Sequence, residues 1–402
     1  MKSYVDLLKT PGVARIIAAQ LTARFPGGML SLAYLLHVEH IFDSYAAAGL
    51  VLAATSIGQA IAGPLTSRWM GAWGMRPVLI LTTVAAAISM GIVAFVAMPL
   101  VGYMIVGFLG GLSQPPIQPA VRTIYPKMVN SRQLTPLFSL DASAQEIIWI
   151  AAPVLVTFVS IQISTVLGIV IAMVFLIGGG AWFISSPEVG RVRIPRSKRK
   201  LGVVLGRPPV LLATVVGFLL VGSCAAIETG VVARFGEDGP QAGIILAFWA
   251  VASLAGGLTF GHVPVGPWAL ARRMGVVFAG CALALFAWDF WSLALTLLIA
   301  GLCIAPALAV MFAIVSASVK FSDTAEAYGW VGTGQLIGAA IGSAVAGFLI
   351  DANGPMGGFV TAAIFAALGF IVPLVFRRAH PDLRGRDASP IPDTEPVQVQ
   401  PS

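Results

Sequence analysis

Twelve apolar runs, each long enough to cross a bilayer as a helix, alternate with short polar segments along the chain. Hydrophobic residues make up 58% of the 402 residues and charged residues only 10%. Soluble domains carry roughly a quarter charged residues, so this chain needs an apolar solvent. Since about 20 apolar residues span a bilayer, we predict an all-α membrane protein. Its spans are expected near 13–36, 45–66, 76–97, 100–121, 136–159, 162–184, 209–232, 241–260, 273–288, 290–318, 327–350 and 357–376.

The basic residues predict the orientation, because Lys and Arg stay on the cytoplasmic side. With the N-terminus inside, 22 of the 24 fall on that side. Arg234 is outside and Arg24 lies within a span. We therefore expect a multi-pass protein of the cell (plasma) membrane with both termini in the cytoplasm. Seven of the basic residues lie in one stretch, namely Arg191, Arg193, Arg196, Lys198, Arg199, Lys200 and Arg207.

This basic stretch divides the chain into two related halves. Gly111, Leu112 and Pro116 match Gly301, Leu302 and Pro306 at an offset of 190, and Gln145 matches Gln335 at the same offset. Parallel repeats of six helices place a binding site between the halves, near the membrane midplane. We predict two pseudo-symmetric six-helix bundles at 1–184 and 208–379, a cytoplasmic linker at 185–207, and a tail at 380–402 that its composition makes disordered.

The segment after the second run resembles the cytoplasmic signature of the major facilitator superfamily. Gly63, Leu65, Arg68, Gly74 and Arg76 fit that signature, while Ser67 replaces its usual aspartate. The resemblance implies two bundles that rock about a central cavity lined by helices 1, 4, 7 and 10. In overall pattern the chain looks most like actinobacterial efflux-type members of unassigned substrate. Gly107 stands where proton-driven exporters carry an arginine, so uptake stays open.

Arg24 is the basic residue that most needs an explanation. It lies about 11 residues into the first span, roughly 16 Å at 1.5 Å per residue, which is near mid-bilayer. A charge there costs at least roughly 2.5–3.5 kcal/mol. We predict an anion site or a switching ion pair; a fixed structural pair is the alternative. Glu146 lies at similar depth in the fifth span and is the expected partner. Pairing and release would then couple proton binding to rocking.

Other polar residues in the fifth span extend this picture. Asp141 lies near the cytoplasmic end of its span, as does Arg122 in the fourth, and we expect the two to pair as an inner gate or a structural clamp. Gln145 follows Asp141 by four residues and shares its helix face. Trp149 shares a stripe with Glu146 and either stacks on a flat substrate or serves as packing.

The second half offers fewer candidates. Glu228 is the only acid in the seventh span; we weigh a proton or cation site that faces the cavity against an acid at the interface. Gln335, which has glycines on both sides, either binds substrate or makes a hydrogen bond between helices. Together with Arg24, Glu146, Gln145 and Trp149, these residues are the predicted substrate and proton-coupling set.

Several functions are excluded by what the sequence lacks. There is no phosphate-binding loop for ATP and no zinc or nucleophile signature, so we expect neither an enzyme nor a cofactor nor a metal site. Topology explains the basic stretch without nucleic acid. We predict a monomeric secondary transporter that uses alternating access and, by proton-coupled efflux, moves a small organic molecule across the lipid bilayer. The alternatives are an uptake permease of the same fold and a non-transporting membrane sensor or assembly partner.

Overall fold

The computed structural model describes residues 2–197, 199–235, 240–261, 263–385 and 388–393, and most of these residues are helical. Lys198 and the tail beyond Asp393 lie outside the described residues. The helices are α1 Lys2–Lys9, α2 Val13–Arg24, α3 Pro26–Phe42, α4 Tyr45–Trp73, α5 Met75–Phe95, α6 Leu100–Leu112, α7 Ile117–Ile124, η1 Tyr125–Lys127, α8 Ser131–Gln162, α9 Thr165–Ser185, α10 Pro187–Arg191, η2 Val203–Gly206, α11 Pro208–Phe235, α12 Pro240–Phe260, α13 Ala269–Ala284, α14 Phe290–Gly301, α15 Ile304–Ser316, α16 Phe321–Asn353, α17 Met356–Val375 and η3 Arg377–Ala379.

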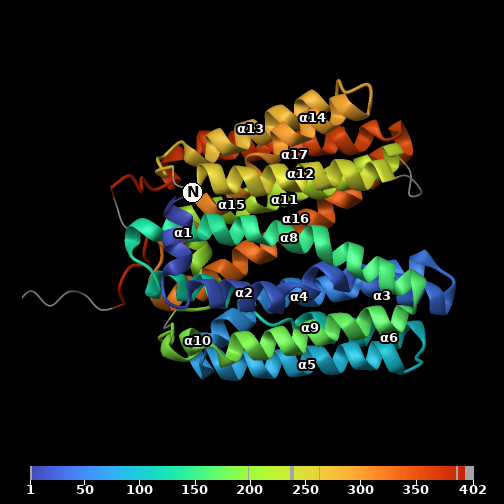
Figure 1. Ribbon diagram of the computed structural model, residues 1–402, viewed down its shortest axis with the longest axis horizontal. Coiled ribbons are helices and arrows are strands. Elements are labelled where there is room, and N and C mark those ends of the chain that lie inside the picture. The colour runs from blue at the N-terminus through green and yellow to red at the C-terminus, as the bar shows by residue number, and fades with distance from the viewer. Residues whose placement is uncertain (1, 198, 236–239, 262, 386–387, 394–402) are drawn as a thin grey trace, which may run out of the picture.

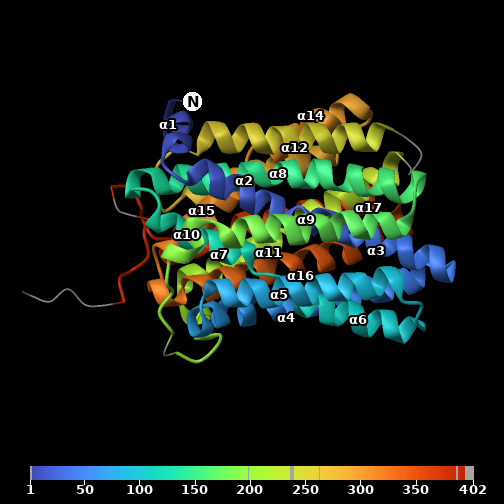
Figure 2. The ribbon, with the colours of Figure 1, turned by 60° about the horizontal axis from the view of Figure 1, so that its bottom comes forward.

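The long helices run roughly along one direction, and the chain's described ends lie together at one end of the bundle (Figure 1). Within the described residues, ten helical segments are long and apolar enough to cross a membrane. The two remaining predicted spans are the α2–α3 pair and α13, which has 16 residues. Figure 2 shows α1, α10 and the tail at the same end of the molecule. By the distribution of basic residues, this is the predicted cytoplasmic end.

Three of the predicted spans are interrupted instead of continuous. The first breaks between α2 and α3, where Pro26 begins the second piece. The fourth breaks between α6 and α7 at the Pro115–Pro116 pair, and the tenth between α14 and α15. Proline removes a ladder hydrogen bond and clashes with the preceding turn, which explains the first two interruptions. The breaks leave backbone groups near the centre of the bundle free to face other partners.

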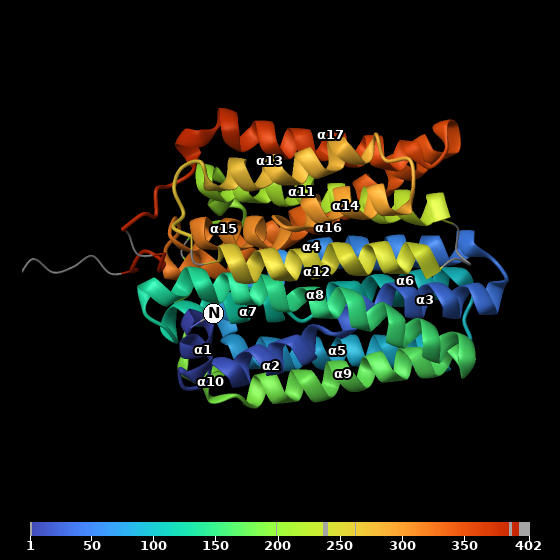
Figure 3. The ribbon, with the colours of Figure 1, turned by 45° about the horizontal axis from the view of Figure 1, so that its top comes forward.

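The two halves lie side by side, with α11, α13, α16 and α17 on one side and α2, α5 and α9 on the other (Figure 3). One seam between them is formed by α4 and α16. Gly63 and Gly329 bring the two backbones so close that a Cβ on Gly329 would lie 2.6 Å from the carbonyl oxygen of Gly63. The Thr333 hydroxyl donates to the Ala60 carbonyl at 2.8 Å. Small residues permit this approach of helices in a bilayer.

The second seam joins α8 to α12. The Ser139 hydroxyl donates to the Gly257 carbonyl at 2.6 Å, and Tyr4, from the N-terminal α1, donates to the same carbonyl at 3.1 Å. Both seams lie in the half of the helices near the termini and the linker. The structure is therefore closed at its predicted cytoplasmic end.

The linker and the tail both bind the start of α16. Asp323 accepts a hydrogen bond from the Ser197 hydroxyl at 2.6 Å, and Glu326 accepts one from the Gly202 amide at 2.7 Å. Ile391 pairs with Lys320 in an isolated bridge. The described part of the tail is thus packed, although its composition predicts disorder, because its backbone finds hydrogen-bond partners beside α16.

Asp393 supplies the N-terminal cap that the first turn of α16 lacks. Lys320, the N-cap residue, makes no side-chain cap hydrogen bond. The Asp393 carboxylate instead accepts from the Ser322 amide at 3.2 Å and from its hydroxyl at 2.6 Å. A carboxylate at a helix N-terminus satisfies exposed N–H groups and complements the helix dipole.

Two truncations test this contact. A chain that ends at Ala388 should lose about 1 kcal/mol of stability, typical of a lost cap, and its amides at 319–326 should exchange faster with solvent. A chain that ends at Asp393 removes only the residues beyond the contact and should match the full chain. Equal hydrogen exchange in both truncations would contradict a role for the tail at α16.

Candidate functional site

The break after α2 places two polar side chains inside the first bundle. Gln20 and Arg24 are four residues apart, so they share one face of α2. The Arg24 guanidinium donates to the Gln20 side-chain oxygen at 2.8 Å. Both face α8, where Asp141 and Gln145 form a second pair at the same spacing. Arg24 also donates to the Gln145 amide oxygen, which is a second point of contact between the two helices.

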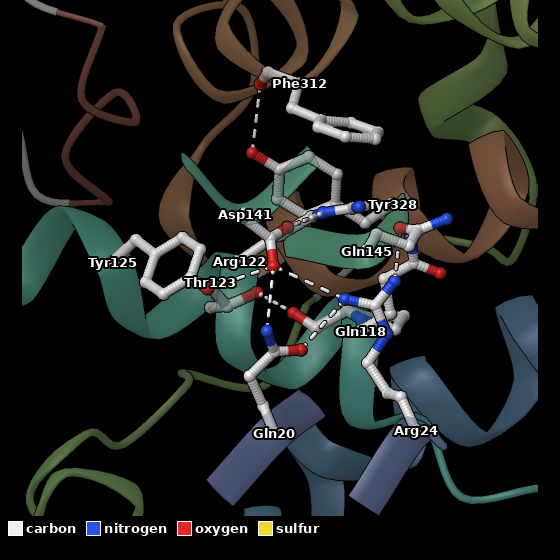
Figure 4. Close-up of polar contacts among 11 residues, drawn as sticks. Gln20, Arg24, Gln118, Arg122, Thr123, Tyr125, Asp141, Gln145, Phe312 and Tyr328 are labelled. Atoms are coloured by element: carbon white, nitrogen blue, oxygen red, sulfur yellow. Dashed lines mark hydrogen bonds and ion pairs between the residues drawn. The ribbon is translucent and has the colours of Figure 1, made fainter. Parts of the chain in front are cut away.

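Asp141 is the centre of the cluster (Figure 4). Its Oδ1 accepts from Gln20 at 3.1 Å, from Arg24 at 3.3 Å and from the Tyr125 hydroxyl at 3.2 Å. Its Oδ2 accepts from Arg122 Nε at 3.2 Å. A carboxylate has about four lone-pair sites, two on each oxygen, so three donors share Oδ1 while Oδ2 keeps room for one more. The pair of Arg122 with Asp141 is the one that the sequence predicts.

The charges in this cluster do not cancel. The side chains of Asp141 and Arg122 are 0% and 2% exposed, and that of Arg24 is 11% exposed. Two arginines therefore share one carboxylate, which leaves one positive charge in a buried setting. Such a charge is costly unless it is hydrogen-bonded or faces a polar space. Arg24, the more exposed of the two, is the group through which a ligand or water would reach it.

The predicted pair of Arg24 with Glu146 is not formed among the described residues. Arg24 binds Asp141, and the Glu146 carboxylate accepts a hydrogen bond from the Ser253 hydroxyl of α12 at 2.9 Å. The reason is helical geometry. Gln145 and Glu146 are successive residues, so their side chains point about 100° apart around α8. The face with Asp141 and Gln145 meets α2, and Glu146 turns toward the other half.

Glu228 lies near Glu146. The two carboxyl groups are close enough for their charges to interact, although Glu146 belongs to α8 in the first half and Glu228 to α11 in the second. Glu228 is exposed and Glu146 is half-buried. Because Glu146 is bonded across the seam to Ser253, these acids lie at the boundary between the halves. The structure thus brings two of the predicted acids together. Neither of them is paired with Arg24 or Arg122, the cations of the Asp141 cluster.

Aromatic rings of the second half cover the Asp141 cluster. The Arg122 guanidinium carbon lies 3.3 Å from the ring centroid of Phe312 in α15. Phe138, Phe312 and Tyr328 pack around one another with centroids 6.3 to 6.4 Å apart. A cation over an aromatic face is attracted by the ring quadrupole, and more strongly when both are desolvated. Arg122 therefore joins an ion pair within its own half to a ring from the other half.

The remaining predicted residues lie away from this cluster. Trp149 is 55% exposed and makes no described ring contact. The Gln335 amide nitrogen is buried without a hydrogen-bond partner and packs beside Gly217 of α11. An unpartnered donor in this position is available to a ligand or a water molecule. Neither residue belongs to the hydrogen-bond network of Arg24.

The residues of the superfamily signature are mostly helical. Gly63, Leu65 and Arg68 belong to α4, which continues to Trp73, so the expected loop shrinks to Gly74. Gly74 has φ of 94°, a conformation that favours glycine. Arg68 forms an ion pair with Glu326 of α16 at 2.9 Å and also binds the Arg199 carbonyl. Arg76 donates to the Ile184 carbonyl at 3.1 Å.

Sequence reasoning missed four residues of this arrangement, namely Gln20, Tyr125, Ser253 and Glu326. Gln20 was detectable, since it precedes Arg24 by one helical turn. Glu326 lies just before the predicted eleventh span and carries a charge near the membrane, which is also a visible signal. Ser253 and Tyr125 have ordinary neighbours, and only the fold brings them to their partners. Among the described residues no group of His, Cys, Asp and Glu could hold a metal ion.

Removing the central carboxylate should destabilise the protein. Asp141→Asn leaves two arginines without a counter-charge, and breaking a buried pair in this way costs about 3–5 kcal/mol. The double variant Asp141→Asn with Arg24→Gln should recover part of that loss because it also removes a cation. Thermal unfolding followed by fluorescence measures both, with the exposed Asp43→Asn as the matched control. A single variant as stable as the control would contradict a central role for Asp141.

The family model of the Major Facilitator Superfamily matches over residues 16–288 and again over 234–398. No curated protein matches the sequence.

Solved structures share the fold at low sequence identity. The human organic anion transporter MFSD10 is 15% identical with a TM-score of 0.71, over 90% of this chain and 100% of that one. A bacterial homologue of the iron transporter ferroportin, in an outward-facing state, is 12% identical with a TM-score of 0.73, over 91% and 99%. The fucose:proton symporter of E. coli is 18% identical with a TM-score of 0.70, over 92% and 98%. The chain belongs to the Major Facilitator Superfamily and is a membrane transporter, not an enzyme.

Proposed function

We propose that this transporter is secondary active and moves a small organic molecule by alternating access, outward across the plasma membrane in exchange for protons, with both termini in the cytoplasm and as a monomer. The observation that carries the proposal is Glu146, a membrane-embedded acid that is hydrogen-bonded across the seam between the halves and lies near a second acid, Glu228. Ionisable residues inside the membrane mark ion and substrate pathways.

The hydrogen-bond directions around Ser253 favour an ionised Glu146 in the closed state. The Ala305 amide donates to the Ser253 hydroxyl oxygen at 3.2 Å. The hydroxyl hydrogen is then free to point at Glu146 Oε1, 2.9 Å away. A hydrogen bond to a carboxylate is roughly twice as strong as one between neutral groups. The cytoplasm-closed arrangement is therefore stabilised by an ionised Glu146.

Protonation acts in the opposite direction. A proton on Glu146 weakens its bond to Ser253. The charge of the nearby Glu228 favours uptake of that proton, because protonation relieves the repulsion between the two carboxylates. A proton that enters from outside thus loosens the seam and favours opening toward the cytoplasm. There the proton leaves, and the carboxylate re-forms its bond once the seam closes again. This order suits a proton that moves inward while substrate moves outward.

The Asp141 cluster has a different role in this cycle. Its ion pairs lie within the first half, so rocking does not break them. Phe312 and Tyr328 leave with the second half, and Arg122 then faces water. We infer that Arg122 and Asp141 form one side of an inner gate, and that the aromatic rings of Phe312 and Tyr328 form the other side. Arg24, Gln145 and Gln335 would be the polar contacts for substrate.

Two of the structural neighbours fit this class. One is described as an organic anion transporter and one as a fucose:proton symporter. The symporter, together with the absence of an arginine at Gly107, favours uptake as the second candidate. The sign of substrate movement under an imposed pH gradient in proteoliposomes separates the two.

A compound screen by thermal shift, followed by flux in proteoliposomes, tests the function itself. Flux of a stabilising compound should be lost in Arg24→Ala. A protein that carries no compound, while remaining folded, would favour the alternative of a non-transporting sensor or assembly partner.

The seam offers a test of alternating access that needs no substrate. Gly329→Ala places a Cβ 2.6 Å from the Gly63 carbonyl oxygen, whereas a Cβ on Gly332, one turn along the same helix, meets nothing within 4 Å. Spin labels at positions 132 and 272, both exposed and in different halves, report the distance by pulsed electron paramagnetic resonance. Gly329→Ala should lengthen it and Gly332→Ala should not. Identical distance distributions would argue against this seam as the closing contact.

The same labels test proton coupling. Lowering the pH should increase the population with the longer distance in the wild-type protein, because protonation weakens the bond of Glu146 to Ser253. Glu146→Gln, which stays neutral at every pH, should give that population at neutral pH and lose the pH response. Glu228→Gln should reduce the response, since it removes the repulsion. A full pH response in both variants would refute the assignment of these acids.

A further inference from the structure

A groove on the outer surface of the first half lies between α5 and α9, which run side by side (Figure 1). Its walls are apolar and include Ile80, Val84, Ile177 and Ala181, and at its cytoplasmic end lie Arg76 and Ser185. From position 76 to position 84 a helix rises about 12 Å. The groove therefore runs from a charged mouth into the depth of the hydrocarbon, which is the shape of a site for an acyl chain with a headgroup.

Arg76 has hydrogen-bonding capacity left at this mouth. Its Nε donates to the Ile184 carbonyl at 3.1 Å and its Nη2 to the Ser186 carbonyl at 3.3 Å. A guanidinium has five N–H donors, so the described contacts use two. Arg76 is exposed, and a planar guanidinium with free N–H groups suits the oxygens of a phosphate.

A second arginine follows the point where α10 meets the first. The guanidinium of Arg76 lies against Gly190, where a Cβ would be 2.6 Å from the guanidinium carbon. Arg191 follows directly and is exposed. The acid of this helix, Glu188, is buried and engaged with Arg15. Arg76 thus lines the mouth of the groove, Arg191 follows the glycine that touches it, and the nearby carboxylate is paired with Arg15.

The level of these arginines matches a bilayer surface. They lie at the end of the bundle that holds the linker and both described chain ends. Two tryptophans lie near this level. Trp73 ends α4, just before α5, and Trp182 belongs to α9. They are 56% and 44% exposed, as expected for rings at the headgroup level. Anionic lipids make the cytoplasmic leaflet negative, and basic pockets between helices on that side bind their headgroups.

We infer that this groove binds one phospholipid of the cytoplasmic leaflet, selected by an anionic headgroup at Arg76 and Arg191, with an acyl chain against Ile80, Val84, Ile177 and Ala181. The site is distinct from the substrate pathway, since it lies on the outer face of α5 and α9. Its occupant ties the first half, through α5, α9 and α10, to the membrane surface.

Native mass spectrometry of the purified full chain tests the site, with dioleoylphosphatidylglycerol and dioleoylphosphatidylcholine as probes. The wild-type protein should retain one phosphatidylglycerol in preference to phosphatidylcholine. Arg76→Gln with Arg191→Gln should bind that lipid about 25-fold more weakly, since each arginine near an anionic surface contributes about a factor of five. Arg132→Gln with Arg378→Gln removes the same charge from two exposed positions elsewhere and should bind as the wild type does.

Arg76 also caps α9, so two further variants keep the test decisive. Arg191→Gln alone should weaken phosphatidylglycerol binding about five-fold without touching α9. Ala181→Phe fills the groove, keeps both arginines, and should abolish retention. If Arg132→Gln with Arg378→Gln loses as much phosphatidylglycerol binding as Arg76→Gln with Arg191→Gln, the lipid is attracted to the basic surface in general. If the wild-type protein retains both lipids equally, the site does not select a headgroup. Either result, or full retention in Ala181→Phe, overturns the inference.

Discussion

The buried carboxylate of Asp141 is the interaction on which the first bundle depends. It lies in a helix that must cross a medium without water, and it meets four donors from three other segments. Satisfying a buried charge fixes the relative rotation of α2, α7 and α8, because each donor reaches it from one direction only. The break after Arg24 contributes to this arrangement. It lets α2 direct Gln20 and Arg24 toward α8 while α3 continues in a different direction.

The contacts that must break during transport are of another kind. Across the two seams the halves are joined by hydroxyl groups on backbone carbonyls, by aromatic rings and by the partly exposed ion pair of Arg68 with Glu326. The hydrogen bonds between neutral groups are weak, at about 0.5–1.5 kcal/mol each. The ion pair of Arg68 with Glu326, whose side chain is 5% exposed, and the cation–π contact of Arg122 with Phe312 also cross between the halves, whereas the ion pairs of Asp141 stay inside one half.

The sequence predicts the helices well, but not the partners of the polar residues inside them. The apolar runs depend on solvent alone, so the spans follow from local composition, and the basic residues supply a predicted orientation. Arg24 and Asp141 stand out because charges in a bilayer are rare. Their pairing is not predictable from depth, since Glu146 and Asp141 both lie in the fifth span within about one and a half turns of each other. The rotation of α8, set by packing against α2 and α12, decides which acid faces the arginine.

That rotation changes what the asymmetry between the halves means. At the repeat offsets Arg24 and Glu146 correspond to Phe218 and Leu336, so the charges of the first half are not duplicated. The second half contributes the complement: a ring face for Arg122 and a hydroxyl for Glu146. The ion pairs of Asp141 stay within one half, so they do not link the halves directly. Glu146 and Glu326 are acids bonded across the seams. In the proposed cycle Glu146, which lies farther from its helix end, is the one that converts proton binding into movement.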